Sequence, residues 1–393
     1  MSTGNPGQYT NCSGGKETLY ASCFALMIYH YFGELDKFES HYLTSWGDYI
    51  LNFQDQKQGY FYGPEISEGK LLSDGHSKTH LYWHSTAHVL PALKILGLVP
   101  RYPLHFVKPF LDINFLKQWL DKRDWTKAWI EGNDLLFVGQ FLIFLNEDEN
   151  NSKAKDSISV LLNWLDSQID LNTGLWGTNG YCDVFNAVYG AYHQLLIYYY
   201  LNHDVLSKKN LINAVLSLQH FDGGFSKNWG GGSCEDVDSI DILVNMFKKT
   251  SHNHEKIITA LKKASYSVLR RMTSEGGFLY KRGAEFMHNG MEYTYAPANR
   301  ANMFSTWFAV HTLFLISEVI DLPCTRGIEY QFNKSCSMGW HSKDNLKKKS
   351  FQHIDSGRII LSKLFSDIYF FARKMKEKFI ILDRTYNVIK RFR

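Results

Sequence analysis

Hydrophobic residues recur along most of this chain at the three- and four-residue spacing of amphipathic α-helices. No run of strictly alternating apolar and polar residues, the pattern of a half-buried strand, interrupts them. The clearest helical stretches alternate along the chain as successive pairs, and they cover residues 157–165, 181–201, 211–218, 234–247, 257–272 and 304–319. The pattern therefore predicts an all-α protein built from helical hairpins.

A short motif recurs between these helices, with one or two glycines before an aromatic residue and usually a glutamine ahead of them. The copies are Gln54…Gly59-Tyr60-Phe61, Gln168…Gly174-Leu175-Trp176, Gln219…Gly223-Gly224-Phe225, Gly276-Gly277-Phe278 and Gln331…Gly339-Trp340. Their first glycines are 115, 49, 53 and 63 residues apart, so the long first interval predicts a degraded copy near Trp119–Trp129. A period of about 50–60 residues is that of a two-helix repeat. Six such hairpins are predicted to close into an (α/α)6 toroid, or barrel, around a central cavity.

The motif itself has a structural interpretation. Glycine tolerates the positive φ of the turn that ends an outer helix. The aromatic residue would anchor the loop between hairpins, and the glutamine would bind freed backbone groups of a neighbouring helix end. Residues 277–304 break the rhythm and are predicted to form a loop across one mouth of the cavity.

The predicted domains are a single toroid with an N-terminal extension over residues 1–350 and a helical basic tail over residues 351–393. The last 21 residues carry eight Lys or Arg against Glu377 and Asp383. This tail is interpreted either as a solvated terminal helix or as a contact with a membrane surface or a partner.

Composition narrows the class of protein. The chain has 393 residues, of which 45% are hydrophobic and 15% aromatic, which suits either an aromatic-walled cavity or an aromatic-rich core. The net charge of +4 is too small to argue for a nucleic-acid partner. Six scattered cysteines without a CxxC pair, and a start without the pattern of a signal peptide, predict a cytoplasmic protein. The apolar runs 135–145 and 304–320 are predicted to be buried core helices.

An acidic cluster follows three glycines at the start of one predicted inner helix. It consists of Glu235, Asp236, Asp238 and Asp241, and residues three apart share one helix face. Crowded carboxylates cannot all ionise cheaply, so at least one is expected to have a raised pKa and to act as a general acid. The alternative is a capping box formed by Ser233 and Asp236, which would explain one or two of the four acids.

Other candidates start the remaining inner helices, where the helix ends are expected to meet at one mouth. Asp183 is either a second catalytic carboxylate or a helix cap. His84 and His88 are four residues apart, but without an HExxH pattern they are interpreted as wall residues, and no metal site is predicted. A zinc site joining Cys234 to a distant His311 is the weaker alternative. The residues predicted to contact substrate are Trp83, His84, Trp176, Tyr181, Phe225, Trp229, Trp307 and Phe308.

The repeats resemble those of the terpenoid cyclase and protein prenyltransferase superfamily over roughly residues 50–345, with Gln219–Phe225 as the best copy. Class II terpene cyclases carry an Asp-x-Asp-Asp motif whose middle acid protonates an isoprenoid, and aromatic walls stabilise the resulting cations. Asp236-Val237-Asp238-Ser239 matches three of these four positions. The resemblance implies that Asp238 is the proton donor, tuned by Asp236 and Glu235. Related cyclases that act on epoxides also lack the last acid.

The resemblance leaves other functions open. The zinc ligands of prenyltransferase β-subunits are not matched in order, because Cys234 precedes Asp236. Similar toroids serve glycoside hydrolases and polysaccharide lyases, through paired carboxylates or Tyr, His and Asn. The leading hypothesis is a protonation-initiated cyclase, and the alternatives are a carbohydrate-active toroid and a non-catalytic binding module. The expected partner is a small isoprenoid or sugar. No cofactor is predicted, except Mg²⁺ if the substrate is a diphosphate, and the protein is placed in the cytoplasm or at a membrane periphery.

Overall fold

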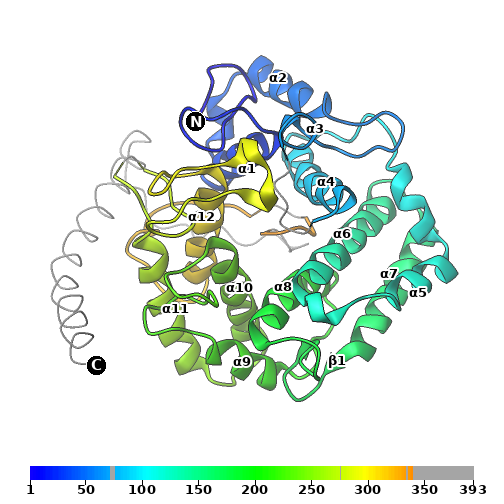
Figure 1. The fold of residues 1–393 in the computed structure, drawn as a ribbon, viewed down its shortest axis with the longest axis vertical. Helices are drawn as coiled ribbons and strands as arrows, with labels where there is room; N and C mark the ends of the chain where they lie inside the picture. The colour runs from blue at the N-terminus through cyan, green and yellow to red at the C-terminus, as the bar shows by residue number, and fades with distance from the viewer. Residues whose placement is uncertain (71–75, 275, 333–334, 340–393) are drawn as a thin grey trace.

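Six helices form a closed inner ring, seen end-on in Figure 1. The computed structural model describes residues 1–70, 76–274, 276–332 and 335–339. Within these residues each inner helix packs against the next, and the last packs against the first. The inner helices are α1 (Leu19–Tyr31), α4 (Lys78–Ile95), α6 (Ala128–Glu147), α8 (Val184–Leu201), α10 (Ser233–Lys249) and α12 (Met303–Ser317). The predicted all-α toroid is confirmed.

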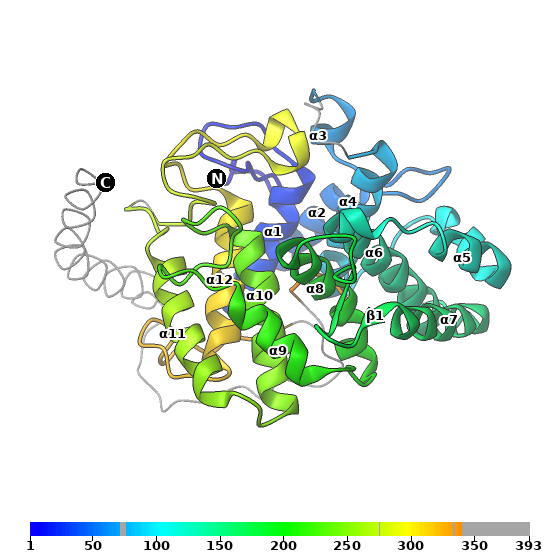
Figure 2. The same cartoon turned by 60° about the horizontal axis from the view of Figure 1, so that its bottom comes forward.

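Outer helices pack on the outside of this ring, as Figure 2 shows for α7, α9 and α11. In the described part of the chain they are α2 (Ser40–Leu51), α5 (Ile113–Leu120), α7 (Ser152–Gln168), α9 (Lys208–Ser217) and α11 (His254–Leu269). Near residues 119–129, where a degraded copy of the motif is predicted, the chain passes from the outer helix α5 to the inner helix α6. The predicted tail, residues 351–393, lies outside the described residues.

Short elements connect the hairpins. They are the single turn α3 (Pro64–Ser67), the 3-10 helices η1 (Leu35–Lys37), η2 (His105–Leu111), η3 (Trp125–Lys127), η4 (His288–Gly290) and η5 (Glu292–Thr294), and the strands β1 (Ile169–Asp170) and β2 (Leu175–Trp176). The two strands pair antiparallel, with Ile169 opposite Trp176, and so bring the second glycine motif back along the end of α7.

The inner helices are buried nearly all round, which explains their apolar sequences. Glycine lets two of them approach closely: a Cβ atom on Gly132 of α6 would lie 2.5 Å from the carbonyl oxygen of Gly190 on α8. The segment Trp125–Glu147 is long and apolar enough to cross a membrane by composition alone, but 67% of its most apolar window is buried inside the protein. The predictions of buried core helices at residues 135–145 and 304–320 agree with this packing.

The glutamine of the motif ties one hairpin to the next. Gln219 donates from Nε2 to the carbonyl oxygen of Gly223, at 3.0 Å, and to that of Ala260 on α11, at 2.8 Å. Gln54 makes the same kind of bridge from Gly59 to Tyr102. The predicted structural role of the motif is therefore confirmed at these two copies.

Replacing Gly223 with alanine is expected to lower the free energy of unfolding by about 2–4 kcal/mol. Its φ is +92°, and a Cβ atom would lie 2.2 Å from the carbonyl oxygen of Lys263, where backbone cannot move aside. Gly283→Ala is the matched control, because its φ is +71° and nothing lies within 4 Å of the added atom. Urea unfolding of the two variants measures the difference, and equal losses would contradict the clash.

Residues 335–339, here called the central segment, lie inside the ring towards the C-terminal ends of the inner helices. Gly339 N donates to Tyr192 Oη at 3.2 Å, and a Cβ atom on Gly339 would lie 2.6 Å from the Trp307 ring. Cys336 is 2% exposed and its thiol lies 3.9 Å from the carbonyl oxygen of Leu196. The chain therefore fills this end of its own lumen.

Two of the cavities in the described part of the protein lie near this end of the ring. One of about 360 Å³ lies between the C-terminal ends of α1 and α4 and the outer helix α2. The other, of about 50 Å³, touches the central segment at Ser335 and Cys336. Neither is lined by a residue of the acidic cluster, so the cluster lies apart from both.

Candidate active site

Residues 277–302, here called the strap, connect α11 to α12 across the N-terminal ends of inner helices. The strap is yellow in Figure 2 and lies at the same end of the ring as the first residues of the chain. Its Tyr280 donates to Glu235 at the start of α10, at 2.7 Å. The ring of its His288 lies 5.1 Å from Tyr20 on α1 and 4.9 Å from His84 on α4. The predicted loop across one mouth is thus observed.

Asp236 has a structural role in this mouth. One carboxylate oxygen accepts from the backbone N–H of Phe225 at 2.8 Å, and the other pairs with Arg271 at 2.6 Å. Both side chains of the ion pair are at most 3% exposed. The capping box is wrong, because the N-cap residue is Gly232 and Asp236 is turned toward the glycine motif and Arg271.

The three glycines before α10 leave room for these side chains. A Cβ atom on Gly231 would lie 2.0 Å from Nη1 of Arg271, and one on Gly232 would lie 2.0 Å from Oε2 of Glu235. Gly231 also has a φ of +80°, which side chains rarely adopt. The glycines therefore make room for the side chains of Arg271 and Glu235.

Glu235 is held from two sides. Besides the bond from Tyr280, its Oε1 accepts from the hydroxyl of Ser226 at 3.3 Å. Burial raises the pKa of Glu235, and the hydrogen bond from Tyr280 opposes that shift. The carboxyl group is therefore fixed in place while its proton is retained more easily than in water.

Asp238 is the most unusual member of the cluster. It is 2% exposed, and its buried Oδ2 has no hydrogen-bond partner in the described part of the protein. Burial, reinforced by Glu235, Asp241 and Asp236, raises the pKa of Asp238 well above its ordinary value. A neutral, unpartnered carboxyl group can donate its proton, which is what a general acid requires.

Asp241 lies one turn further along α10 and is fully buried. Its Oδ1 accepts from the amide of Asn245 at 3.0 Å. Burial raises the pKa of Tyr192 and of Tyr31 on other inner helices, and Asp241 adds to both shifts. Asp241 is thus electrostatically coupled to tyrosines deeper in the ring.

Asp183 lies at the rim. It caps α8 through the N–H of Asn186, at 3.1 Å, and pairs with Lys227 at 2.9 Å while its side chain is 41% exposed. Because backbone and ammonium groups already hold it, the capping alternative accounts for its position. Among the described contacts none joins Asp183 to Asp238.

The predicted substrate-contacting residues are scattered. Trp176 is buried beneath α7, where its indole donates to the carbonyl oxygen of Leu165, and the Trp83 ring packs on Phe110 in the outer layer. Trp229 and Tyr181 are 48% and 56% exposed. Phe225, Trp307 and Phe308 are also buried within the core. Among the described ring contacts, His84 is the member of this set that touches the strap, through His288.

The inner helices carry buried polar atoms without hydrogen-bond partners among the described residues, a feature that sequence patterns did not reveal. Several are buried and hydrogen-bond to no described residue, which is rare in folded proteins unless water or a ligand satisfies them. Besides Asp238 Oδ2 they include His88 Nε2, Gln140 Oε1, both amide atoms of Gln194, Ser239 Oγ and Ser305 Oγ. The interior of the ring is therefore provided with groups that suit hydroxyl-bearing ligands.

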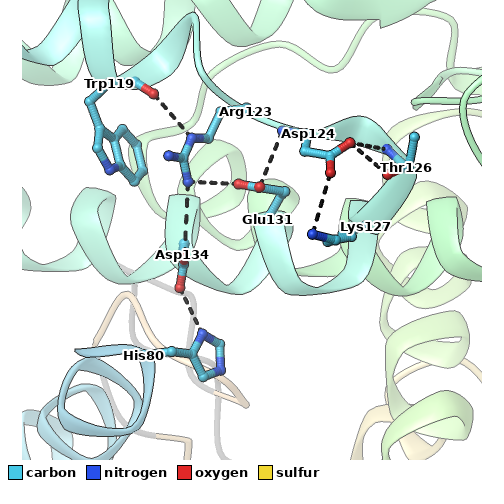
Figure 3. Close-up of polar contacts among 8 residues, drawn as sticks. All are labelled: His80, Trp119, Arg123, Asp124, Thr126, Lys127, Glu131 and Asp134. Atoms are coloured by element: carbon cyan, nitrogen blue, oxygen red, sulfur yellow. Dashed lines mark hydrogen bonds and ion pairs between the residues drawn. The ribbon is translucent and has the colours of Figure 1, made fainter. Parts of the chain in front are cut away.

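An ion-pair network supports the α4–α6 side of the mouth, as Figure 3 shows. His80 lies 2.8 Å from Asp134, and Arg123 bridges Asp134 at 3.9 Å and Glu131 at 2.6 Å. The Arg123 guanidinium also lies 3.9 Å above the Trp119 ring. The network fixes the start of α4, the helix that carries His84.

The zinc site of protein prenyltransferases does not fit these residues. Burial and the neighbouring carboxylates hold the pKa of Cys234 well above its ordinary value. No group of three or more His, Cys, Asp or Glu within the described ranges is placed to hold a metal ion.

The match to a protein family agrees with the toroid fold. Residues 112–299 and 237–354 match the model of the prenyltransferase alpha-alpha toroid domain. No curated protein matches the chain. One similar solved structure is a polysaccharide lyase, with 13% identity, 77% of this chain and 88% of that chain covered, and a TM-score of 0.43.

Proposed function

Because the chain belongs to the family of the prenyltransferase alpha-alpha toroid domain, we propose that it is an enzyme that performs acid catalysis at the mouth beneath the strap. Asp238 is the general acid, and Glu235 is the second carboxyl group. The observation that carries the proposal is the buried carboxyl of Asp238, whose Oδ2 has no hydrogen-bond partner among the described residues and whose pKa is raised chiefly by burial. Asp236 positions the helix start through Arg271 and takes no proton in this scheme.

The substrate class proposed is a carbohydrate. Inner-helix groups such as those of Gln194, Ser239 and Ser305 are buried and hydrogen-bond to none of the residues that the structure describes, and sugar hydroxyls can both donate to and accept from them. Residues three apart on a helix have Cβ atoms about 5–6 Å from each other. Asp238 and Glu235 therefore lie close enough on α10 for the charge of Glu235 to reinforce the effect of burial on the pKa of Asp238, and we assign them as an interacting carboxyl pair.

Cyclisation of an isoprenoid is the second candidate. It is favoured by the match of Asp236-Val237-Asp238 to the acid motif of class II cyclases. A cluster of aromatic rings also supports it: Phe24 stacks on Trp307 at 5.4 Å, and Trp307 contacts Phe308 at 4.5 Å. Such rings stabilise cations, but here they pack against one another inside the core.

A substrate-pool assay tests the proposal. The full chain is incubated separately with a pool of neutral and acidic oligosaccharides and with squalene and isoprenoid diphosphates, with and without Mg²⁺. We expect products from the oligosaccharide pool alone, detected by mass spectrometry. Turnover of an isoprenoid would establish the second candidate instead, and no turnover in any pool would favour a non-catalytic binding module.

A further inference from the structure

A second group of chemistry-bearing side chains lies beneath the strap, separate from the acidic cluster. It consists of Tyr20 from α1, His84 and His88 from α4, and His288 from the strap, and is here called the tyrosine–histidine cluster. The four side chains are 3–6% exposed. The ring of His84 lies 4.7 Å from that of His88 and 4.9 Å from that of His288. Three separate segments of the chain therefore meet at this point.

The hydrogen-bonding capacity of the cluster is only partly used. Tyr20 Oη lies 2.7 Å from Nδ1 of His84. Nε2 of His88 and Nδ1 of His288 are buried and hydrogen-bond to no described residue. A buried polar atom left unsatisfied costs about 1–3 kcal/mol. These two ring nitrogens point to a ligand that would satisfy them.

The cluster is uncharged at neutral pH. Burial lowers the pKa of His88 to about 3 and holds the pKa values of His84 and His288 well below the ordinary value for histidine. Burial also raises the pKa of Tyr20, and the carboxyl of Glu65 adds to that effect. An anionic ligand would find no compensating charge here, so the chemistry suits a neutral ligand.

Neutral imidazoles also bind metal ions, but the described histidines are not arranged as a ligand set. A hydroxyl group satisfies both requirements of the cluster, since it donates to one ring nitrogen and accepts from another N–H. Stacked rings continue from the cluster toward the acids: Phe286 lies 6.4 Å from His288 and 4.8 Å from Tyr280, which binds Glu235.

We propose that the tyrosine–histidine cluster binds the hydroxyl groups of a neutral saccharide beneath the strap. Its ligand class rests on the proposed carbohydrate function, whereas its geometry is independent of Asp238. In this proposal the cluster holds the sugar through its hydroxyl groups, and the acidic cluster is a separate group of side chains at the same mouth.

Binding of neutral disaccharides to the full chain tests this proposal. The probes are cellobiose, maltose, lactose and diacetylchitobiose, with dissociation constants from isothermal titration calorimetry. We expect at least one to bind, and His88→Ala and His288→Ala each to weaken it about tenfold or more. His254→Ala, at the start of an outer helix, is the matched control and is expected to bind like the wild type. Circular dichroism verifies that each variant is folded.

A second measurement uses the wild-type protein and therefore does not depend on whether the variants fold. In wild-type protein labelled with ¹⁵N-histidine, the bound saccharide is expected to shift the ring-nitrogen signals of His88 and His288. No binding by any probe, or binding that leaves these signals and affinities unchanged, overturns the proposal, as does Zn²⁺ binding that requires the same histidines. Saccharide binding that depends on the histidines, without any turnover, would remove the proposed enzyme and keep this site.

Discussion

Asp238→Asn is expected to reduce turnover of the substrate found in the pool assay by about 10²–10⁴-fold. The amide has almost the shape of the carboxyl group, so packing inside the ring is retained, but it has no acidic proton to give. Because Oδ2 of Asp238 has no hydrogen-bond partner in the described part of the chain, the substitution breaks no contact of that atom. Steady-state kinetics measures the loss.

The matched control is Asp204→Asn, on the turn before α9, where the side chain is 78% exposed and pairs with Lys208. Its turnover is expected to stay within about twofold of the wild type, since exposed ion pairs contribute little. Equal activities for the two variants would exclude Asp238 as the acid.

The pH profile gives an independent result. Because the folded protein raises the pKa of Asp238, the carboxyl keeps its proton to a higher pH than an ordinary aspartic acid. Wild-type kcat is expected to fall as pH rises through that pKa, and the residual activity of Asp238→Asn is expected to lack this step.

The same shift links the stability of the protein to pH. The contribution of Asp238 to the free energy of unfolding is greatest below the unfolded pKa of about 4 and declines as pH rises toward the folded pKa.

Arg271→Met is expected to lower the free energy of unfolding by about 3–5 kcal/mol. The substitution leaves the carboxylate of Asp236 buried, at 1% side-chain exposure, with the N–H of Phe225 as its remaining partner among the described residues. It also removes the guanidinium that packs over Gly231 at the start of α10. Denaturant unfolding followed by circular dichroism measures the change.

Arg326→Met is the comparison for this effect. Arg326 pairs with Asp321, but both side chains are about 60% exposed, so its loss is expected to cost at most about 1 kcal/mol. If the two arginine variants unfold at the same denaturant concentration, the stabilising role of Asp236 is contradicted.

The toroid was predictable because the sequence motifs that specify it are local and are repeated along the chain. Each glycine motif specifies a turn, and Gln219 and Gly223 behave as their chemistry requires because the partner hairpin recurs at a fixed distance. The acidic cluster was predictable for the same reason, since spacing along α10 places Asp238 beside Glu235.

The partners of these acids were not predictable. Arg271 lies 35 residues beyond Asp236, so the capping box was the simplest local interpretation and proved wrong. Tyr280 and His288 reach the mouth only through the docking of the strap, which no periodicity specifies. The aromatic residues chosen as cavity walls were misleading because Trp and Phe also fill the space between helix layers, as Trp176 does.

Closure of the ring also constrains how the chain reaches its native state. α1 packs on α12, and Asn11 near the N-terminus accepts from Met303 N through its carbonyl oxygen. During synthesis, the face of α1 that contacts α12 therefore stays uncovered until almost 300 further residues have been added. Contacts of such long sequence separation slow folding. The central segment enters the ring later still. We expect the nascent protein to depend on chaperones until residue 339 has left the ribosome, and the ring to be assembled from its middle hairpins outward.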